Sequence, residues 1–172
     1  MKAGQPDEVM AANIAHDFGL SDITSIKRMA TGLCHFVYEV ISPDRNIVVR
    51  IGALENRHLI EGAAYWYERL KKIGVPLSTL FMVDSIASFP FMIMERLPGR
   101  DLGDVYTVLS DAEKRNLAFE LQSIQNRVSE LPLGNGYGYL TSYEMQAPYK
   151  DAVSFNLAYL NRTRAWFRKA EI

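Results

Sequence analysis

The break at Leu97-Pro98-Gly99 limits most strongly how this chain can fold, because it separates two segments with different hydrophobic patterns. Before the break, short runs of β-branched and aromatic residues alternate with turn formers and one long amphipathic stretch. After it, most apolar residues recur at helical spacing. Proline followed by glycine ends regular structure and is typical of a linker. The sequence therefore predicts an α+β unit over residues 1–97 and a helical unit over residues 98–172.

The first segment is predicted to form a small sheet with two helices. Turn formers fill Ser42 to Asn46, which favours a tight antiparallel hairpin between the second and third strands. Gly74 and the following Val75-Pro76 end the longer helix. The predicted elements are three strands within 23–51, strands over 80–86 and 91–96, a lead-in helix over 6–18 and a helix over 56–73.

The second segment is predicted to be helical. Ser110 and Glu113 have the spacing of a capping box, in which each side chain bonds the backbone amide of the other, and a long helix follows to about Glu130. A loop over 131–138 and a last helix over 152–167 complete the chain. We expect the apolar residues of the long helix to supply apolar contacts, namely Ala112, Leu117, Phe119, Leu121, Ile124 and Val128.

Composition excludes several kinds of partner and compartment. Nineteen basic and twenty acidic residues give a net charge of -1, which provides no general attraction to nucleic acid or anionic lipid. No apolar stretch approaches the roughly 20 residues of a membrane helix, and the first residues lack the apolar run of a secretion signal. The single cysteine, Cys34, cannot form an internal disulfide. We therefore expect a cytoplasmic protein with no nucleic-acid or membrane partner.

Four short segments carry residues suited to binding a phosphorylated ligand. Thr31-Gly32 opens a turn before the second strand, where glycine lets backbone amides approach phosphate oxygens closely. Arg50 is the one charged residue in the run Val48 to Ile51, and its planar fork suits phosphate or carboxylate. Glu61 lies one turn into the following helix. The run Phe91 to Gly99 is an apolar strand that leads into the Pro-Gly break.

Each segment also fits an ordinary structure when taken alone. The turn at Gly32 is then a plain hairpin turn and Arg50 an exposed strand charge. Glu61 is then a solvated helix residue, with Glu55 and Glu68 as competitors for any role. A core strand that ends in a turn accounts for the last apolar run. None of these interpretations explains the order of the elements around the four segments.

In this order, the four segments resemble the aminoglycoside phosphotransferase family over roughly residues 22–104. The resemblance implies an α+β, protein-kinase-like N-terminal lobe, with a five-stranded antiparallel sheet and one main helix, followed by an incomplete helical C-terminal lobe. It also implies ATP with Mg as cofactor and transfer of a phosphoryl group to a hydroxyl of a small-molecule acceptor. Aminoglycoside, amino alcohol, sugar amine and macrolide all remain open as the acceptor.

The same resemblance implies a nucleotide site. Arg50 takes the place of the phosphate-contacting lysine and pairs with Glu61. The Glu95 carbonyl and the Leu97 amide face the edge of the adenine. The other residues implied in nucleotide binding are Gly32, Cys34 and His35 in the nucleotide-positioning loop, Met94 behind the adenine, and Asp101 or Asp104 near the ribose.

The sequence contains no convincing match to the residues that perform phosphoryl transfer in this family, an H-G-D-x-x-x-x-N loop and a later metal-binding aspartate. The run His16 to Gly19 has the letters of a kinase metal motif, but it precedes the glycine turn and closes a helix. Tyr149 to Asn156 has the spacing of the catalytic loop, but tyrosine replaces the histidine and the segment is predicted to begin a helix. The histidines and the cysteine lack metal-ligand spacing. We therefore assign no catalytic and no metal-binding residue.

These observations predict the N-terminal part of a phosphotransferase, truncated and inactive as this chain alone. Self-association is expected where the missing lobe would leave an apolar helical face uncovered. The alternative is a non-catalytic kinase-like module that binds a nucleotide or a partner protein.

Overall fold

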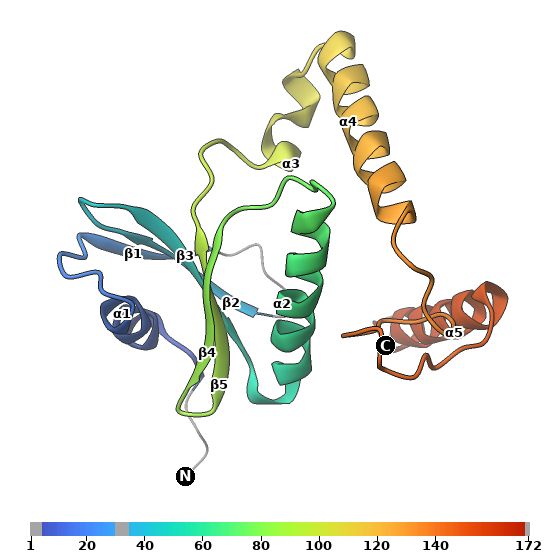
Figure 1. Ribbon diagram of the computed structural model, residues 1–172, viewed down its shortest axis with the longest axis horizontal. Helices are drawn as coiled ribbons and strands as arrows, with labels where there is room; N and C mark the ends of the chain where they lie inside the picture. The colour runs from blue at the N-terminus through green and yellow to red at the C-terminus, as the bar shows by residue number, and fades with distance from the viewer. Residues whose placement is uncertain (1–4, 30–34, 171–172) are drawn as a thin grey trace.

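The structure of the protein is a computed structural model that describes residues 5–29 and 35–170, without the side chains of residues 162 and 164–170. The described chain forms one five-stranded sheet with helices on both faces, followed by a helical part (Figure 1). Its elements in chain order are α1 (Glu8–Asp17), β1 (Ser25–Met29), β2 (His35–Ile41), β3 (Asn46–Gly52), η1 (Leu54–Asn56), α2 (Arg57–Lys72), β4 (Leu80–Ile86), β5 (Phe89–Glu95), α3 (Leu102–Val105), η2 (Tyr106–Val108), α4 (Asp111–Ser129) and α5 (Ala152–Ala170).

The sheet is antiparallel throughout, with the strand order β1-β2-β3-β5-β4. The predicted hairpin joins β2 to β3, and in its turn the Ser42 hydroxyl donates to the Arg45 carbonyl oxygen at 2.9 Å. After β3 the chain passes through α2 to the edge strand β4, and β5 then returns beside β3. The structure thus confirms the predicted α+β fold with a five-stranded antiparallel sheet and one main helix.

Alternate residues of β3 lie on opposite faces of the sheet, because the side chains of a strand alternate. Ile47, Val49 and Ile51 face α1 and are fully buried in one apolar cluster with Ile14 of that helix. Figure 1 shows α1 and α2 on opposite sides of the sheet. The face toward α1 is therefore filled with apolar side chains.

The opposite face carries Val48, Arg50 and Gly52, and α2 covers only one end of it. An added Cβ at Gly52 would come within 2.9 Å of Ile60 in α2, so helix and strand approach closely there. Farther along the strand, Arg50 and Val48 are half-buried, and so is Met94, the β5 partner of Val48. We call the surface formed by Val48, Arg50 and Met94 the half-open face.

A segment of the helical part packs on the outer side of α2. Trp66 Nε1 donates to the Leu140 carbonyl oxygen at 2.8 Å. The Tyr143 amide donates to the Tyr65 hydroxyl at 3.1 Å, and the rings of Trp66 and Tyr143 meet edge to face at 4.9 Å between centroids. We call residues 139–145 the docking segment. It ties the second half of the chain to the main helix of the first.

The predicted capping box begins α4. The Glu113 amide donates to the Ser110 hydroxyl at 3.3 Å, and the Ser110 amide donates to Glu113 Oε2 at 2.8 Å. However, α4 has no buried residue, and Phe119 and Leu121 are 68% and 56% exposed. The apolar residues of α4 therefore do not enter the core, although Leu117 and Ile124 are half-buried. Helical spacing indicates that a helix has an apolar side, but not that another element covers it.

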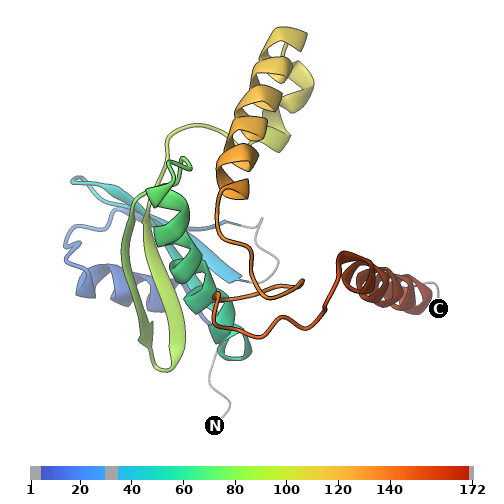
Figure 2. The ribbon, with the colours of Figure 1, turned by 45° about the vertical axis from the view of Figure 1, so that its right-hand side comes forward.

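The last helix, α5, is capped by Asp151, whose Oδ1 accepts from the Ser154 amide at 2.7 Å. This contact confirms that Tyr149 to Asn156 begins a helix. Figure 2 shows α4 and α5 standing away from the sheet. Within the described ranges, no helix combines the length and the apolar character needed to cross a membrane.

Gly62→Ala is expected to lower the free energy of unfolding. An added Cβ would lie 2.8 Å from the Thr141 Cβ and 3.0 Å from its Cα, so the docking segment would have to move away from α2. Overpacking costs about 1–3 kcal/mol and the gain in helix propensity is up to ~1 kcal/mol, which leaves a net loss of roughly 1 kcal/mol. Urea unfolding measures it. Gly134→Ala, where the nearest atom is 3.8 Å away, is the control, and a Gly62→Ala protein as stable as wild type would contradict the close contact.

Candidate functional site

Arg50 and His35 meet on the face of the sheet away from α1. His35 begins β2 and pairs in register with Gly52, two residues beyond Arg50 in β3. The Arg50 Nη2 atom lies 3.0 Å from His35 Nδ1. Because a guanidinium has donors but no acceptor, Nδ1 must accept the hydrogen bond, and the imidazole proton is then on Nε2. His35 is neutral when it holds Arg50 in this way.

Burial and the neighbouring cation both favour the neutral imidazole. Desolvation, and then the charge of Arg50, lower the pKa of His35 from 6.5 to about 4. Its Nε2 atom is buried, and among the described residues no group bonds to it. A buried donor without a partner costs about 1–3 kcal/mol. The buried Nε2–H group of His35 therefore costs stability in the folded chain.

Glu61 lies one turn into α2 and forms an ion pair with Arg57, whose Nη1 lies 3.7 Å from Glu61 Oε1. The two side chains are 61% and 44% exposed, respectively, so the pair contributes little to stability. Arg57 also donates to the Ser88 carbonyl oxygen at 2.6 Å. The pairing of Glu61 with Arg50 that the sequence indicated stays a prediction.

The end of β5 has an unusual set of hydrogen bonds. The Glu95 amide donates to the Thr79 carbonyl oxygen at 2.8 Å, on the β4 side of the strand. In a regular antiparallel ladder the Thr79 amide would donate in return to the Glu95 carbonyl. Here it donates instead to the Glu95 carboxylate, to Oε2 at 2.9 Å, and the Thr79 hydroxyl donates to the same oxygen at 2.8 Å.

Because the Thr79 amide bonds a side-chain oxygen, the backbone pairing of β4 and β5 changes where β5 ends. The Thr79 amide bonds the Glu95 carboxylate and not the Glu95 carbonyl. Outside the helix and strand ladders, no described backbone group accepts from the Leu97 amide. The two hydrogen bonds from Thr79 also lower the pKa of the Glu95 carboxyl, because they stabilise its charged form. The ionised side chain therefore holds the edge strand by binding the amide that would otherwise pair with its own carbonyl.

Arg96 ties the linker after β5 to the sheet. Its Nε donates to Glu39 Oε1 of β2 at 2.7 Å, and the two side chains are 29% and 20% exposed. The Arg96 amide donates to the Asn46 carbonyl oxygen at 3.4 Å, and its guanidinium also contacts the Leu97 carbonyl. The linker is thus fixed beside the half-open face.

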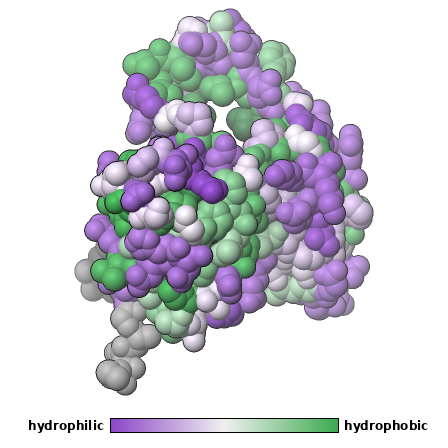
Figure 3. Space-filling view, turned by 60° about the vertical axis from the view of Figure 1, so that its left-hand side comes forward, coloured by the Kyte–Doolittle hydropathy of each residue, from purple (hydrophilic) through white to green (hydrophobic). Residues whose placement is uncertain are grey.

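A hollow of about 490 Å³ lies beside this linker, within the size range of small-molecule sites. Asp101 lines it and also caps α3, since its Oδ1 accepts from the Gly103 amide at 2.7 Å. Figure 3 shows a hollow between the part of the molecule that carries α3 and α4 and the body beneath it. The lining residues are Lys27, Arg28, Met29, Glu39, Arg96, Gly99, Arg100, Asp101 and Asp104.

The structure brings several of the predicted site residues together. His35, Arg50 and Met94 share one face of the sheet, and Glu95 and Leu97 lie where β5 ends. Gly32 and Cys34 lie outside the described residues. Sequence reasoning missed Thr79, Glu39 and Arg96, because their roles depend on cross-strand contacts that no local pattern indicates.

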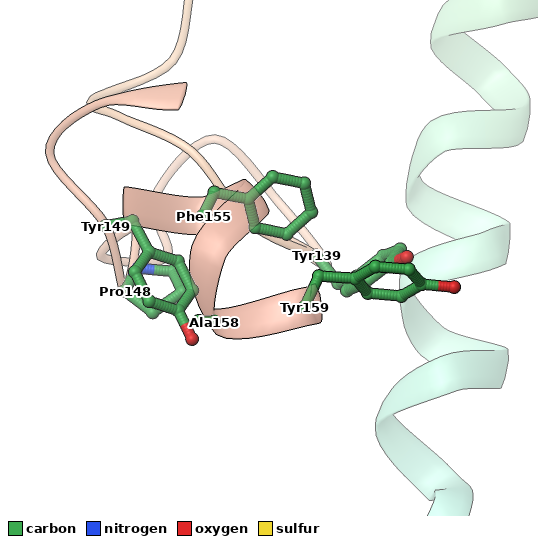
Figure 4. A pocket seen from close by; sticks show the side chains of 6 residues that line it. All are labelled: Tyr139, Pro148, Tyr149, Phe155, Ala158 and Tyr159. Carbon is green, nitrogen blue, oxygen red and sulfur yellow. The ribbon is translucent and has the colours of Figure 1, made fainter. Parts of the chain in front are cut away.

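A second, aromatic hollow of about 230 Å³ lies at the start of α5. Figure 4 shows Pro148 and Tyr149 at one end, Tyr139 and Tyr159 at the other, and the Phe155 ring between them. The Phe155 ring lies 5.8 Å from both the Tyr139 and the Tyr149 ring, between centroids. It belongs to the helical part and shares no lining residue with the hollow at the linker. In the part of the chain that the structure describes, no group of three or more histidine, cysteine, aspartate or glutamate side chains could hold a metal ion.

The kinase-like phosphotransferase fold is defined by an antiparallel five-stranded sheet, one main helix on the face away from α1, a linker and a following helical part. The chain belongs to the phosphotransferase enzyme family (APH), whose family model matches residues 25–167. This match confirms the family that the four sequence segments indicated.

Solved aminoglycoside phosphotransferases have a similar fold. A GDP complex of a mutant aminoglycoside 2'-phosphotransferase-IIIa superposes with a TM-score of 0.60 at 19% identity, over 73% of this chain and 42% of that one. Aminoglycoside phosphotransferase APH(4)-Ia gives a TM-score of 0.59 at 13% identity, over 87% of this chain and 49% of that one. The chain thus matches less than half the length of either protein. No curated protein sequence matches it significantly.

His35→Phe is expected to reduce the loss of stability between pH 6.5 and 5. In the unfolded chain His35 binds a proton below its ordinary pKa of 6.5, whereas the folded chain binds it only near 4, so acid favours unfolding in this window. The lowered carboxyl pKa values of Glu95 and Glu113 affect stability only below about 4.5. Urea unfolding at several pH values measures the slope. His58→Phe, at an exposed position, is the control, and an unchanged slope for His35→Phe would contradict the assignment.

Proposed function

We propose that this chain is the nucleotide-binding part of an ATP-dependent phosphotransferase that acts on a hydroxyl of a small molecule. The observation that carries the proposal is the half-open face, where Arg50 lies on the same side of the sheet as Met94. Next to it, at the end of β5, the Thr79 amide bonds the Glu95 carboxylate and not the Glu95 carbonyl. Family membership and the kinase-like fold support a phosphotransferase.

Adenine is proposed to bind where β5 meets the linker. The Glu95 carbonyl would accept from the exocyclic amine, and the Leu97 amide would donate to a ring nitrogen. Met94 and Val48, paired across β5 and β3, offer apolar surface to the ring. Asp101, on the wall of the hollow, is proposed to face the ribose.

The phosphate chain is proposed to lie over Arg50. A guanidinium binds phosphate through two parallel, charge-assisted hydrogen bonds. That one of the similar structures is a GDP complex supports a nucleotide as ligand of this fold. The family resemblance alone supports a place near the phosphates for Gly32, Cys34 and Glu61.

The transfer step is proposed to need residues beyond this chain. The described residues do not fit a magnesium site, because no group of three suitable side chains comes together. Magnesium supplies charge neutralisation between the phosphates in this chemistry, and we assign no step of it to this chain. We expect the chain to bind a nucleotide weakly and to catalyse no transfer alone.

The acceptor is left as a small molecule with a free hydroxyl, with aminoglycosides, amino alcohols, sugar amines and macrolides as candidates. The titles of the similar structures name aminoglycoside phosphotransferases. A cytoplasmic location also remains an expectation, as does self-association through the exposed apolar residues of α4 and α5.

A non-catalytic kinase-like module that binds a nucleotide or a protein is the second candidate. It is favoured by the same lack of a metal-binding group among the described residues. Magnesium-dependent phosphorylation of any hydroxyl acceptor by the full protein would exclude it.

Arg50→Ala is expected to weaken ATP binding by about tenfold, since charge-assisted hydrogen bonds contribute roughly 1.5–3 kcal/mol. Isothermal titration with ATP and magnesium measures the affinity. Arg115→Ala removes the same charge from an exposed position on α4 and should leave the affinity unchanged. No thermal shift with saturating ATP would contradict the nucleotide site, and robust ATP turnover by the chain would contradict the expected inactivity.

Glu95→Ala is expected to weaken ATP binding by a factor of about five, corresponding to one hydrogen bond of roughly 1 kcal/mol. Without the carboxylate, the Thr79 amide is free to complete the ladder with the Glu95 carbonyl and so to occupy the adenine acceptor. Titration of both proteins with ATP measures the change. Glu113→Ala, which removes the cap of α4, is the control, and equal affinity in Glu95→Ala and wild type would contradict this use of the carbonyl.

A further inference from the structure

We propose that His35 is the positioning residue of Arg50, and that its Nδ1 atom holds the guanidinium on the half-open face before a phosphate chain arrives. This inference rests on the proposed role of Arg50 in nucleotide binding. In this role His35 orients Arg50 and does not touch the ligand itself.

The contact has the geometry of a positioning interaction. Arg50 Nη2 and His35 Nδ1 are 3.0 Å apart, and they come from neighbouring strands with fixed register. An arginine side chain has several rotatable bonds, and ordering it on binding reduces affinity. A short side chain on the adjacent strand can order it in advance, because the backbone of the sheet is rigid.

A neutral partner suits this role better than a carboxylate. A carboxylate would offset part of the positive charge that attracts phosphate, whereas the imidazole accepts a hydrogen bond without adding charge. Glu61, the acidic residue expected beside Arg50 from the family resemblance, has its ion pair with Arg57 and is 61% exposed. His35 does hold the Arg50 guanidinium in the structure, through its Nδ1 atom at 3.0 Å.

The second imidazole nitrogen argues against packing as the sole role of the ring. His35 Nε2 is buried, and the described residues offer it no hydrogen-bond partner. Phenylalanine would fill similar space without leaving a buried polar atom unpaired. The feature that histidine offers here and phenylalanine lacks is therefore the Nδ1 acceptor, which bonds Arg50.

The contact can be tested without any ligand. Two-bond ¹H–¹⁵N spectra of the imidazoles in the wild-type chain are expected to show His35 with its proton on Nε2 and with Nδ1 as acceptor. Arg50→Ala should shift the Nδ1 resonance. A proton on Nδ1, or a His35 spectrum that Arg50→Ala leaves unchanged, would overturn the contact, whether or not the chain binds ATP.

The role is tested by comparing ATP with adenosine. His35→Phe is expected to weaken ATP binding by about fivefold, the value of one hydrogen bond, and to leave adenosine binding unchanged, since adenosine has no phosphates. His35→Asn keeps an acceptor near the Nδ1 position and should restore ATP affinity to within about twofold of wild type. His58→Phe, at an exposed position on α2, is the matched control.

A double variant separates positioning from general damage. If His35 acts through Arg50, His35→Phe adds no further loss of ATP affinity in an Arg50→Ala background. Equal losses for ATP and adenosine, additive losses in the double variant, or no rescue by His35→Asn would each overturn the proposal. If the wild-type chain bound neither ATP nor adenosine, the proposed function and the positioning role would both fall, while the imidazole spectra would still decide the contact.

Discussion

The register of β3 against β2 and β5 is the constraint on which the rest of the structure depends. It places Val49 in the apolar layer under α1 and Arg50 on the opposite face, beside Met92 of β5 and near His35 of β2. A shift by one residue would bury the guanidinium among aliphatic side chains and turn the valine outward. The hairpin turn, closed by the Ser42 hydroxyl, fixes this register locally.

Much of the fold could be predicted from local patterns. The turn residues from Ser42 to Asn46, the Ser110–Glu113 capping box and the glycine after α2 each specify a backbone conformation by short-range bonding, and each occurs as expected. The burial of α4 could not be predicted in the same way. Phe119 has the spacing of a core residue but is 68% exposed, because burial depends on what lies opposite the helix.

The site was predictable to a lesser extent. The sequence shows that Arg50 is the one charged residue in its strand. Its contact with His35, however, joins residues 15 positions apart on two strands. The role of Glu95 is less visible still. Its carboxylate binds the amide and hydroxyl of Thr79, so one side chain ends the ladder that its own backbone would otherwise continue. Neither contact has a signature in spacing or composition, since both depend on which strands become neighbours.

The packing of the docking segment on α2 has a consequence for the order in which the protein matures. Trp66 and Tyr65 bond to groups that lie 74 to 79 positions later in the chain. On the ribosome, α2 therefore emerges long before its outer partners are made. Until then two large aromatic rings on the nascent helix stay uncovered, and such surfaces attract chaperones or neighbouring chains. The aromatic side of the main helix is thus completed late in synthesis, although the helix itself is encoded early.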